Sequence, residues 1–92
     1  MTAEAAEELA VQALTYIAGD SEQLGRFLAM TGIGPGEIRG AAQEPGFLAG
    51  VLDYIAGDER LLSDFAAEAG IDPGDIGKAR AALGGHWERE IP

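Results

Sequence analysis

The sequence contains one pattern twice, with the second copy offset by 38 residues. Residues 14–42 align with residues 52–80 without a gap, and 15 of these 29 positions are identical. Unrelated segments would share far fewer positions, so the match predicts two copies of one structural unit. We assign the copies to residues 9–43 and 47–81, inside a single domain that spans the 92 residues.

Apolar residues recur at helical spacing in both copies. The first helix of each copy carries a stripe at positions i, i+3, i+4 and i+7. These residues are Ala10, Ala13, Leu14 and Ile17 in the first copy, and Leu48, Val51, Leu52 and Ile55 in the second. No segment alternates apolar and polar residues for long enough to predict a strand.

The pattern predicts three helical pieces in each copy. Over the whole chain they fall at about residues 3–18, 21–31, 35–42, 45–56, 59–69 and 73–83. The predicted fold is all-α, a compact bundle of about six short helices built from two three-helix repeats. Two repeats are fewer than a solenoid needs, so we favour a closed bundle over a stacked array.

Residues that typically begin helices recur with the pattern. Asp20 and Asp58 are predicted N-caps, because their carboxylates can accept bonds from the free amides of the following helix. Gln23, three residues after Asp20, is predicted to complete a capping box, whereas Leu61 at the matching position cannot. Pro35 is expected at the first position of the third helix, as is the proline of the second copy.

Glycines are predicted to end the helices. Gly19 and Gly57 follow the first helix of each copy, and Gly32 and Gly70 follow the second, where a left-handed residue commonly closes a helix. The last helix is expected to end at Gly84-Gly85, with residues 86–92 as a flexible tail.

Composition excludes several classes of function. The chain has no cysteine, which removes disulfides, thiolate zinc sites and thiol catalysis. Its first ten residues carry three glutamates where a secretory signal would carry Lys or Arg, so we expect a cytoplasmic protein. A net charge of -10 disfavours nucleic acids and anionic membranes as partners.

Two spaced elements of the repeat resemble a small proteobacterial family that is known only as a domain of unknown function. One element is YIAGD followed by Leu and Phe, and the other is GIxPGxI. They occupy residues 16–27 with 32–38, and residues 54–65 with 70–76, and the likeness extends over about residues 9–85. The resemblance implies a short helical bacterial protein and supplies no catalytic or binding residue.

The turn at Gly32–Gly36 resembles the hairpin of helix-hairpin-helix DNA-binding modules, in which backbone amides bind a phosphate. Such modules place cations beside the turn, whereas this one is followed by Glu37, and Arg39 and Arg26 are the only cations that could assist it. The second copy has Asp72 and Asp75 at the matching places. Nucleic-acid binding through this hairpin therefore remains an alternative and is not our first hypothesis.

No constellation of catalytic residues is apparent. The only histidine, His86, lies beside Glu88 and Glu90 near the end of the chain, and the only serines, Ser21 and Ser63, follow helix caps. We therefore expect no enzyme activity, no cofactor and no functional metal.

Three aromatic residues are candidates for an interaction patch. Tyr16 and Tyr54 recur at the edge of the apolar stripe, and Trp87 lies in the predicted tail. Boundary packing is the simpler explanation for the two tyrosines, and folding back onto the bundle is the simpler explanation for Trp87. We predict an acidic protein-protein interaction module that binds an unidentified protein or itself. The alternatives are nucleic-acid binding and an acidic mimic of nucleic acid.

Overall fold

The computed structural model describes residues 1–88, with their side chains except those of residues 35, 45 and 84–88. Over this range the chain forms six α-helices, one 3-10 turn and no strand. The elements are α1 (Ala3–Ala18), α2 (Ser21–Thr31), η1 (Pro35–Glu37), α3 (Ile38–Ala41), α4 (Pro45–Ala56), α5 (Glu59–Ala69) and α6 (Gly74–Glu88). The predicted all-α bundle is confirmed, and its construction from two repeats stays a prediction from the sequence.

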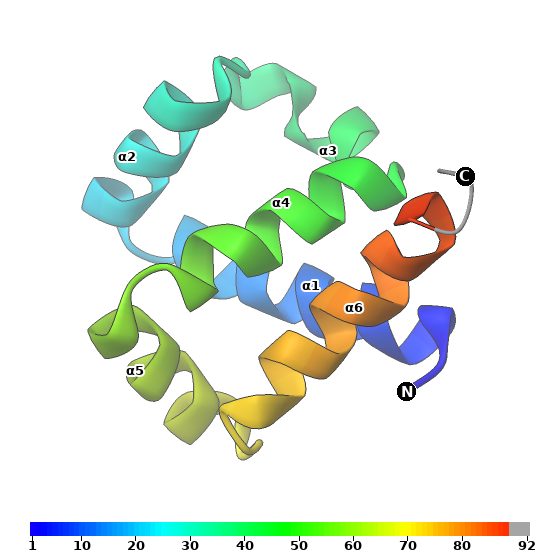
Figure 1. Cartoon of the computed structure of the whole chain (residues 1–92). Helices are drawn as coiled ribbons and strands as arrows, with labels where there is room; N and C mark the ends of the chain where they lie inside the picture. The colour runs from blue at the N-terminus through cyan, green and yellow to red at the C-terminus, as the bar shows by residue number, and fades with distance from the viewer. Residues whose placement is uncertain (89–92) are drawn as a thin grey trace.

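Helices α1, α4 and α6 pack against one another and form the centre of the bundle (Figure 1). Both predicted apolar stripes lie in this centre, because all of their side chains are buried. Helix α6 adds Ile76, Ala79 and Leu83. Burial of a Leu-sized or Ile-sized side chain contributes about 1.5–3 kcal/mol, so this three-helix contact is the main source of stability.

Helices α2 and α5 flank the centre on the same side of the molecule (Figure 1). Asp20 accepts bonds from the backbone N–H groups of the second and third residues of α2, at 3.0 and 3.3 Å. Asp58 does the same for α5, at 3.0 and 3.1 Å. Both helices end at glycines with positive φ, 74° at Gly32 and 69° at Gly70. The predicted caps of these two helices are confirmed.

The prediction for Gly19 and Gly57 was wrong, because both are right-handed, with φ of -74° and -76°. The chain leaves each of these helices through a tightened turn. The N–H of Asp20 donates to the carbonyl of Ile17 at 3.1 Å, and the corresponding bond of the second half measures 3.2 Å. These bonds satisfy helix-end carbonyls without a left-handed residue.

The capping box predicted for Gln23 is also absent. The N–H of Asp20 donates to the carbonyl of Ile17, so it does not donate to the side chain of Gln23. Instead, Oε1 of Gln23 accepts a hydrogen bond from the hydroxyl of Tyr54. A contact between the two halves of the chain has replaced a local one.

The last helix is longer than predicted, since α6 continues through Gly84-Gly85 to Glu88. Glycine costs only about 0.5–1 kcal/mol in a helix interior, which is too little to stop a helix that is already packed through Ile76, Ala79 and Leu83. Residues 86–88 of the predicted tail are therefore helical, and residues 89–92 lie outside the described residues.

The corresponding segment of the first half is much shorter. The helix predicted for residues 35–42 is divided into the turn η1 and the four-residue helix α3. None of the side chains described in these two elements is fully buried. Pro45 then occupies the first turn of α4, as predicted.

Candidate functional site

Tyr16 and Tyr54 are half-buried, and each packs on a phenylalanine from the other half of the chain. The Tyr16 ring on α1 lies 5.4 Å from the Phe65 ring on α5. The Tyr54 ring on α4 lies 5.3 Å from the Phe27 ring on α2, and Phe47 contacts Phe27 as well. The two phenylalanines are almost fully buried, so these pairs are part of the core. The tyrosines therefore have a packing role, whatever else they do.

The hydroxyl groups of the two tyrosines differ in their surroundings. The Tyr54 hydroxyl donates to Oε1 of Gln23 at 2.9 Å. The residue that aligns with Gln23 in the second half is Leu61, which is buried and has no side-chain acceptor. Among the described side chains the Tyr16 hydroxyl has no hydrogen-bond partner. The Tyr16 hydroxyl is therefore available to a ligand, whereas that of Tyr54 is already used.

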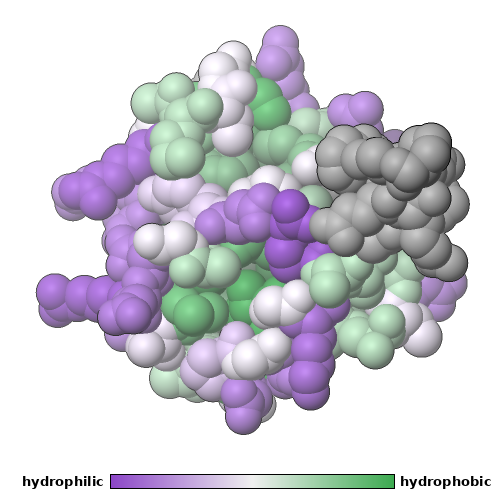
Figure 2. Space-filling model, viewed as in Figure 1, coloured by the Kyte–Doolittle hydropathy of each residue, from purple (hydrophilic) through white to green (hydrophobic). Residues whose placement is uncertain are grey.

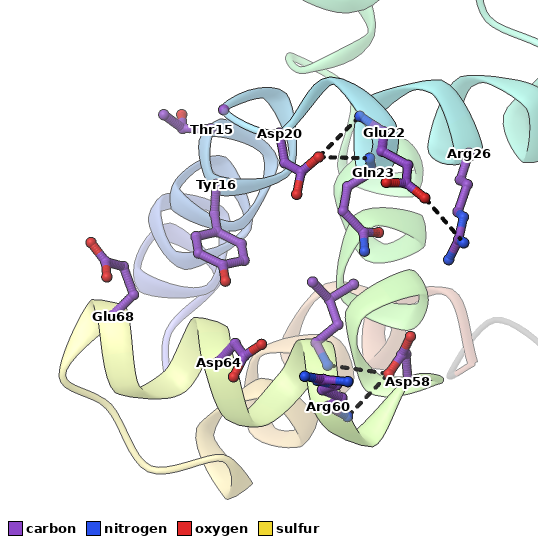
Figure 3. Close-up of a pocket in the computed structure, with 12 residues that line it drawn as sticks. Thr15, Tyr16, Asp20, Glu22, Gln23, Arg26, Asp58, Arg60, Asp64 and Glu68 are labelled. Atoms are coloured by element: carbon purple, nitrogen blue, oxygen red, sulfur yellow. Dashed lines mark hydrogen bonds and ion pairs between the residues drawn. The ribbon is translucent and has the colours of Figure 1, made fainter.

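Tyr16 lines a cleft of about 900 Å³ between the α1–α2 corner and α5 (Figure 3). Both N-cap residues, Asp20 and Asp58, are part of its lining. The lining residues are Thr15, Tyr16, Gly19, Asp20, Glu22, Gln23, Arg26, Asp58, Arg60, Leu61, Asp64 and Glu68. Hydrophilic side chains also extend outward on this side of the molecule (Figure 2). We call this hollow the acidic cleft, because its lining carries more carboxylates than cations.

Most of the carboxylates in the acidic cleft already have partners. Asp20 and Asp58 accept backbone bonds at the starts of α2 and α5. Oε1 of Glu22 lies 3.6 Å from a guanidinium nitrogen of Arg26 in an exposed ion pair. In the part of the chain that the structure describes, Asp64 and Glu68 make no ion pair. Among the described residues, Asp64 and Glu68 are therefore the two carboxylates of the cleft, on one face of α5, that make neither a hydrogen bond nor an ion pair.

These carboxylates influence Tyr16 directly. Partial burial raises the pKa of the Tyr16 hydroxyl, and the negative charges of Asp64, Glu68 and Asp20 raise it further. Each carboxylate disfavours the phenolate, so the hydroxyl keeps its proton in the neutral range. The three carboxylates that contribute to this shift place negative charge near the Tyr16 hydroxyl, and negative charge attracts a cation.

The structure describes the side chains of two of the three aromatic residues in the predicted patch. Tyr16 lines the acidic cleft, and Tyr54 lines an adjoining hollow between α2 and α4. Trp87 belongs to α6, but its side chain lies outside the described residues, as does that of His86. Sequence reasoning missed Asp64 and Glu68, because their closeness to Tyr16 depends on how α5 packs on α1.

At the hairpin Gly32–Gly36, a carboxylate of the protein itself occupies the start of the following helical segment. Oε2 of Glu37 accepts a hydrogen bond from the backbone N–H of Gly34 at 3.3 Å. In the second half, Asp72 accepts from the N–H of Gly74 at 2.8 Å. A carboxylate thus stands where a phosphate would bind, at both places.

Among the side chains that the structure describes, which do not include those of residues 84–88, no group of three His, Asp or Glu residues is arranged to hold a metal ion. None of the helices within residues 1–88 combines the length and apolar character that crossing a bilayer requires.

Comparison with known proteins identifies the family. Residues 3–86 match the model of a family described as "Protein of unknown function (DUF3572)". The chain belongs to this family. The resemblance seen in the two repeated elements is thereby confirmed, and the family description supplies no activity. No curated protein and no solved structure matches the chain.

Proposed function

We propose that this protein is a protein-interaction module without catalytic activity, and that its acidic cleft receives a basic segment of a partner protein. One observation carries the proposal: the cleft places the unpartnered hydroxyl of Tyr16 beside the unpaired carboxylates of Asp64 and Glu68. The absence of cysteine is compatible with action in the cytoplasm.

The chemistry of the cleft favours a lysine or arginine side chain. Two carboxylates and a hydroxyl oxygen can all accept hydrogen bonds from a cationic donor, and a bond between a cation and a carboxylate is stronger than a neutral one. The net charge of -10 also speeds the approach of a basic partner.

Nucleic acid fits these observations less well. A phosphate would meet Glu37 at the first hairpin and Asp72 at the second. An acidic mimic would have to present its carboxylates to a basic groove, whereas Asp64 and Glu68 line a hollow. Neither alternative is supported by an observation of its own.

Affinity capture from lysate tests the proposal with the double variant Asp64→Asn, Glu68→Gln. The matched control is Glu4→Gln, Glu8→Gln, which removes two exposed glutamates from α1 outside the cleft. We expect a partner protein that the wild type and the control retain, that the cleft variant loses, and that elutes as salt is raised.

Cross-linking followed by mass spectrometry should connect that partner to α5 through a basic segment. Equal capture by the cleft variant and the wild type would overturn the proposal. Capture of nucleic acid instead of protein would also overturn it. If a second copy of this chain is retained, light scattering will detect the dimer, and the same variants decide whether the cleft forms its interface.

A further inference from the structure

The acidic cleft continues into a smaller hollow at each of its ends. On one side, a hollow of about 250 Å³ between α1 and α5 shares Thr15, Tyr16 and Glu68 with the cleft. On the other side, a hollow of about 490 Å³ between α2 and α4 shares Arg26 and Asp58 with it. Figure 3 shows the two sets of shared residues at opposite ends of the cleft. The three hollows therefore form a continuous groove.

The two ends of this groove differ in chemistry from its centre. The hollow between α1 and α5 ends at Phe65 and Ala69. The hollow between α2 and α4 is bordered by Ala29, Met30 and the ring of Tyr54. Met30 is 73% exposed, an unusual exposure for so apolar a residue. Apolar surface thus lies on both sides of the acidic centre.

We infer that the groove binds an extended segment of the partner protein that has basic residues at its centre and one apolar residue toward each end. This inference rests on the proposed function and adds the pattern of the segment. The basic side chains lie against Asp64 and Glu68, where the charges are complementary. The flanking apolar side chains cover Met30 at one end and Ala69 at the other. Charge positions the segment, and apolar burial supplies much of its affinity.

Fluorescence anisotropy with synthetic peptides tests the pattern. A peptide of about ten residues is ~33 Å long when extended, which approaches the longest dimension of the molecule, 39 Å. The probe peptide is Ser-Leu-Ser-Ser-Arg-Arg-Ser-Ser-Leu-Ser, and variants move each leucine by one position to allow for spacing. Comparison peptides replace both leucines by serine, or both arginines by glutamate.

We expect the leucine-arginine peptide to bind about tenfold or more tightly than the peptide without leucines, because each apolar side chain buries surface. The glutamate peptide should not bind. On the protein, Met30→Ser should weaken the leucine-arginine peptide several-fold and leave the leucine-free peptide unchanged. The matched control is Val11→Ser, which removes an exposed apolar residue of α1 that lies outside the groove and should change neither affinity.

The outcomes separate this inference from the proposed function. If arginine peptides bind equally with and without leucines at every spacing, and Asp64→Asn weakens them, the pattern is overturned while the acidic cleft stands. If no arginine peptide binds at any spacing, the pattern is overturned, and affinity capture decides the proposed function separately. If Met30→Ser and Val11→Ser have equal effects, the apolar end of the groove is wrongly placed.

Discussion

The segments that follow α2 and α5 begin alike and end differently. Both contain GIxPGxI, yet residues 33–44 form a turn and a four-residue helix at the surface, whereas residues 71–88 include the 15-residue helix α6 in the core. Pro45 in the first half aligns with Leu83 in the second. The residue before a proline favours an extended conformation, and Glu44 has φ -100° and ψ 123°. One proline thus stops a helix that the other half continues.

This comparison shows that the shared motif specifies how a helix begins and says little about its length. The length depends on the residues downstream of the motif, where the two halves differ. It also explains why α1, α4 and α6 form the centre of the bundle while α3 lies at its edge. Four experiments can break or sharpen the comparison.

The largest effect is expected from Leu83→Pro, which gives the second half the proline of the first. The proline ring and its missing N–H cost about 3 kcal/mol or more in a helix interior. Loss of the buried leucine adds about 2 kcal/mol or more. The sum approaches the whole stability of a small domain, so urea titration by circular dichroism should show an unfolded protein at room temperature. The control Leu83→Ala loses only the side chain, and equal midpoints for the two variants would contradict our explanation.

A smaller contrast is expected between the aligned isoleucines Ile76 and Ile38. Ile76 is 1% exposed on α6, so Ile76→Ala should lower the free energy of unfolding by about 2–5 kcal/mol. Ile38 is only half-buried on α3, and Ile38→Ala should cost about 1 kcal/mol. Chemical denaturation of the two variants measures both values. Equal losses would show that the first segment contributes as much to the core as α6 does.

The two tyrosines should differ by a single hydrogen bond. Tyr54→Phe removes the bond to Gln23 and should cost about 0.5–1.5 kcal/mol, whereas Tyr16→Phe should leave the stability almost unchanged. A double-mutant cycle with Gln23→Leu isolates the bond, because this change makes the first half match Leu61 of the second. If Tyr16→Phe is the more costly change, the Tyr16 hydroxyl has a structural partner and our account of the cleft fails.

The smallest effect concerns the pKa of Tyr16, which lies above its ordinary value of 10.0. In the Tyr54→Phe background Tyr16 is the only tyrosine, so absorbance near 295 nm follows its titration alone. Asp64→Asn should lower this pKa toward the ordinary value, because one of the charges that disfavour the phenolate is removed. A pKa raised in the folded state stabilises the protein below pH 10, and this contribution is lost as the pH rises through the folded-state value. An unchanged titration in Asp64→Asn would place the carboxylate too far from Tyr16 to matter.

The sequence predicted those features of the fold that local chemistry determines. The helix starts at Asp20 and Asp58 and the left-handed ends at Gly32 and Gly70 follow from neighbouring residues, and all were confirmed. The end of α6 was predicted wrongly, because packing against α1 and α4 outweighs the cost of two glycines.

Contacts between the halves were beyond local reasoning. Gln23 looked like part of a capping box, but its partner is Tyr54, which lies one half of the chain away. Tyr16 was recognised as a candidate, yet the neighbours that define the acidic cleft, Asp64 and Glu68, come from α5. Their positions depend on how the helices cross, which no spacing in the sequence encodes.

The exchanged aromatic pairs described above also limit how this chain can come apart. Phe27 of the first half is buried against α4, and Phe65 of the second is buried against α1. A half released from its neighbour would expose its phenylalanine to water. Each half therefore needs the other in order to bury its own aromatic core residue. The short connection between α3 and α4 keeps the two halves at a high effective concentration relative to each other. The bundle should therefore melt in one cooperative step, and a chain cut at this connection should reassemble from its two fragments.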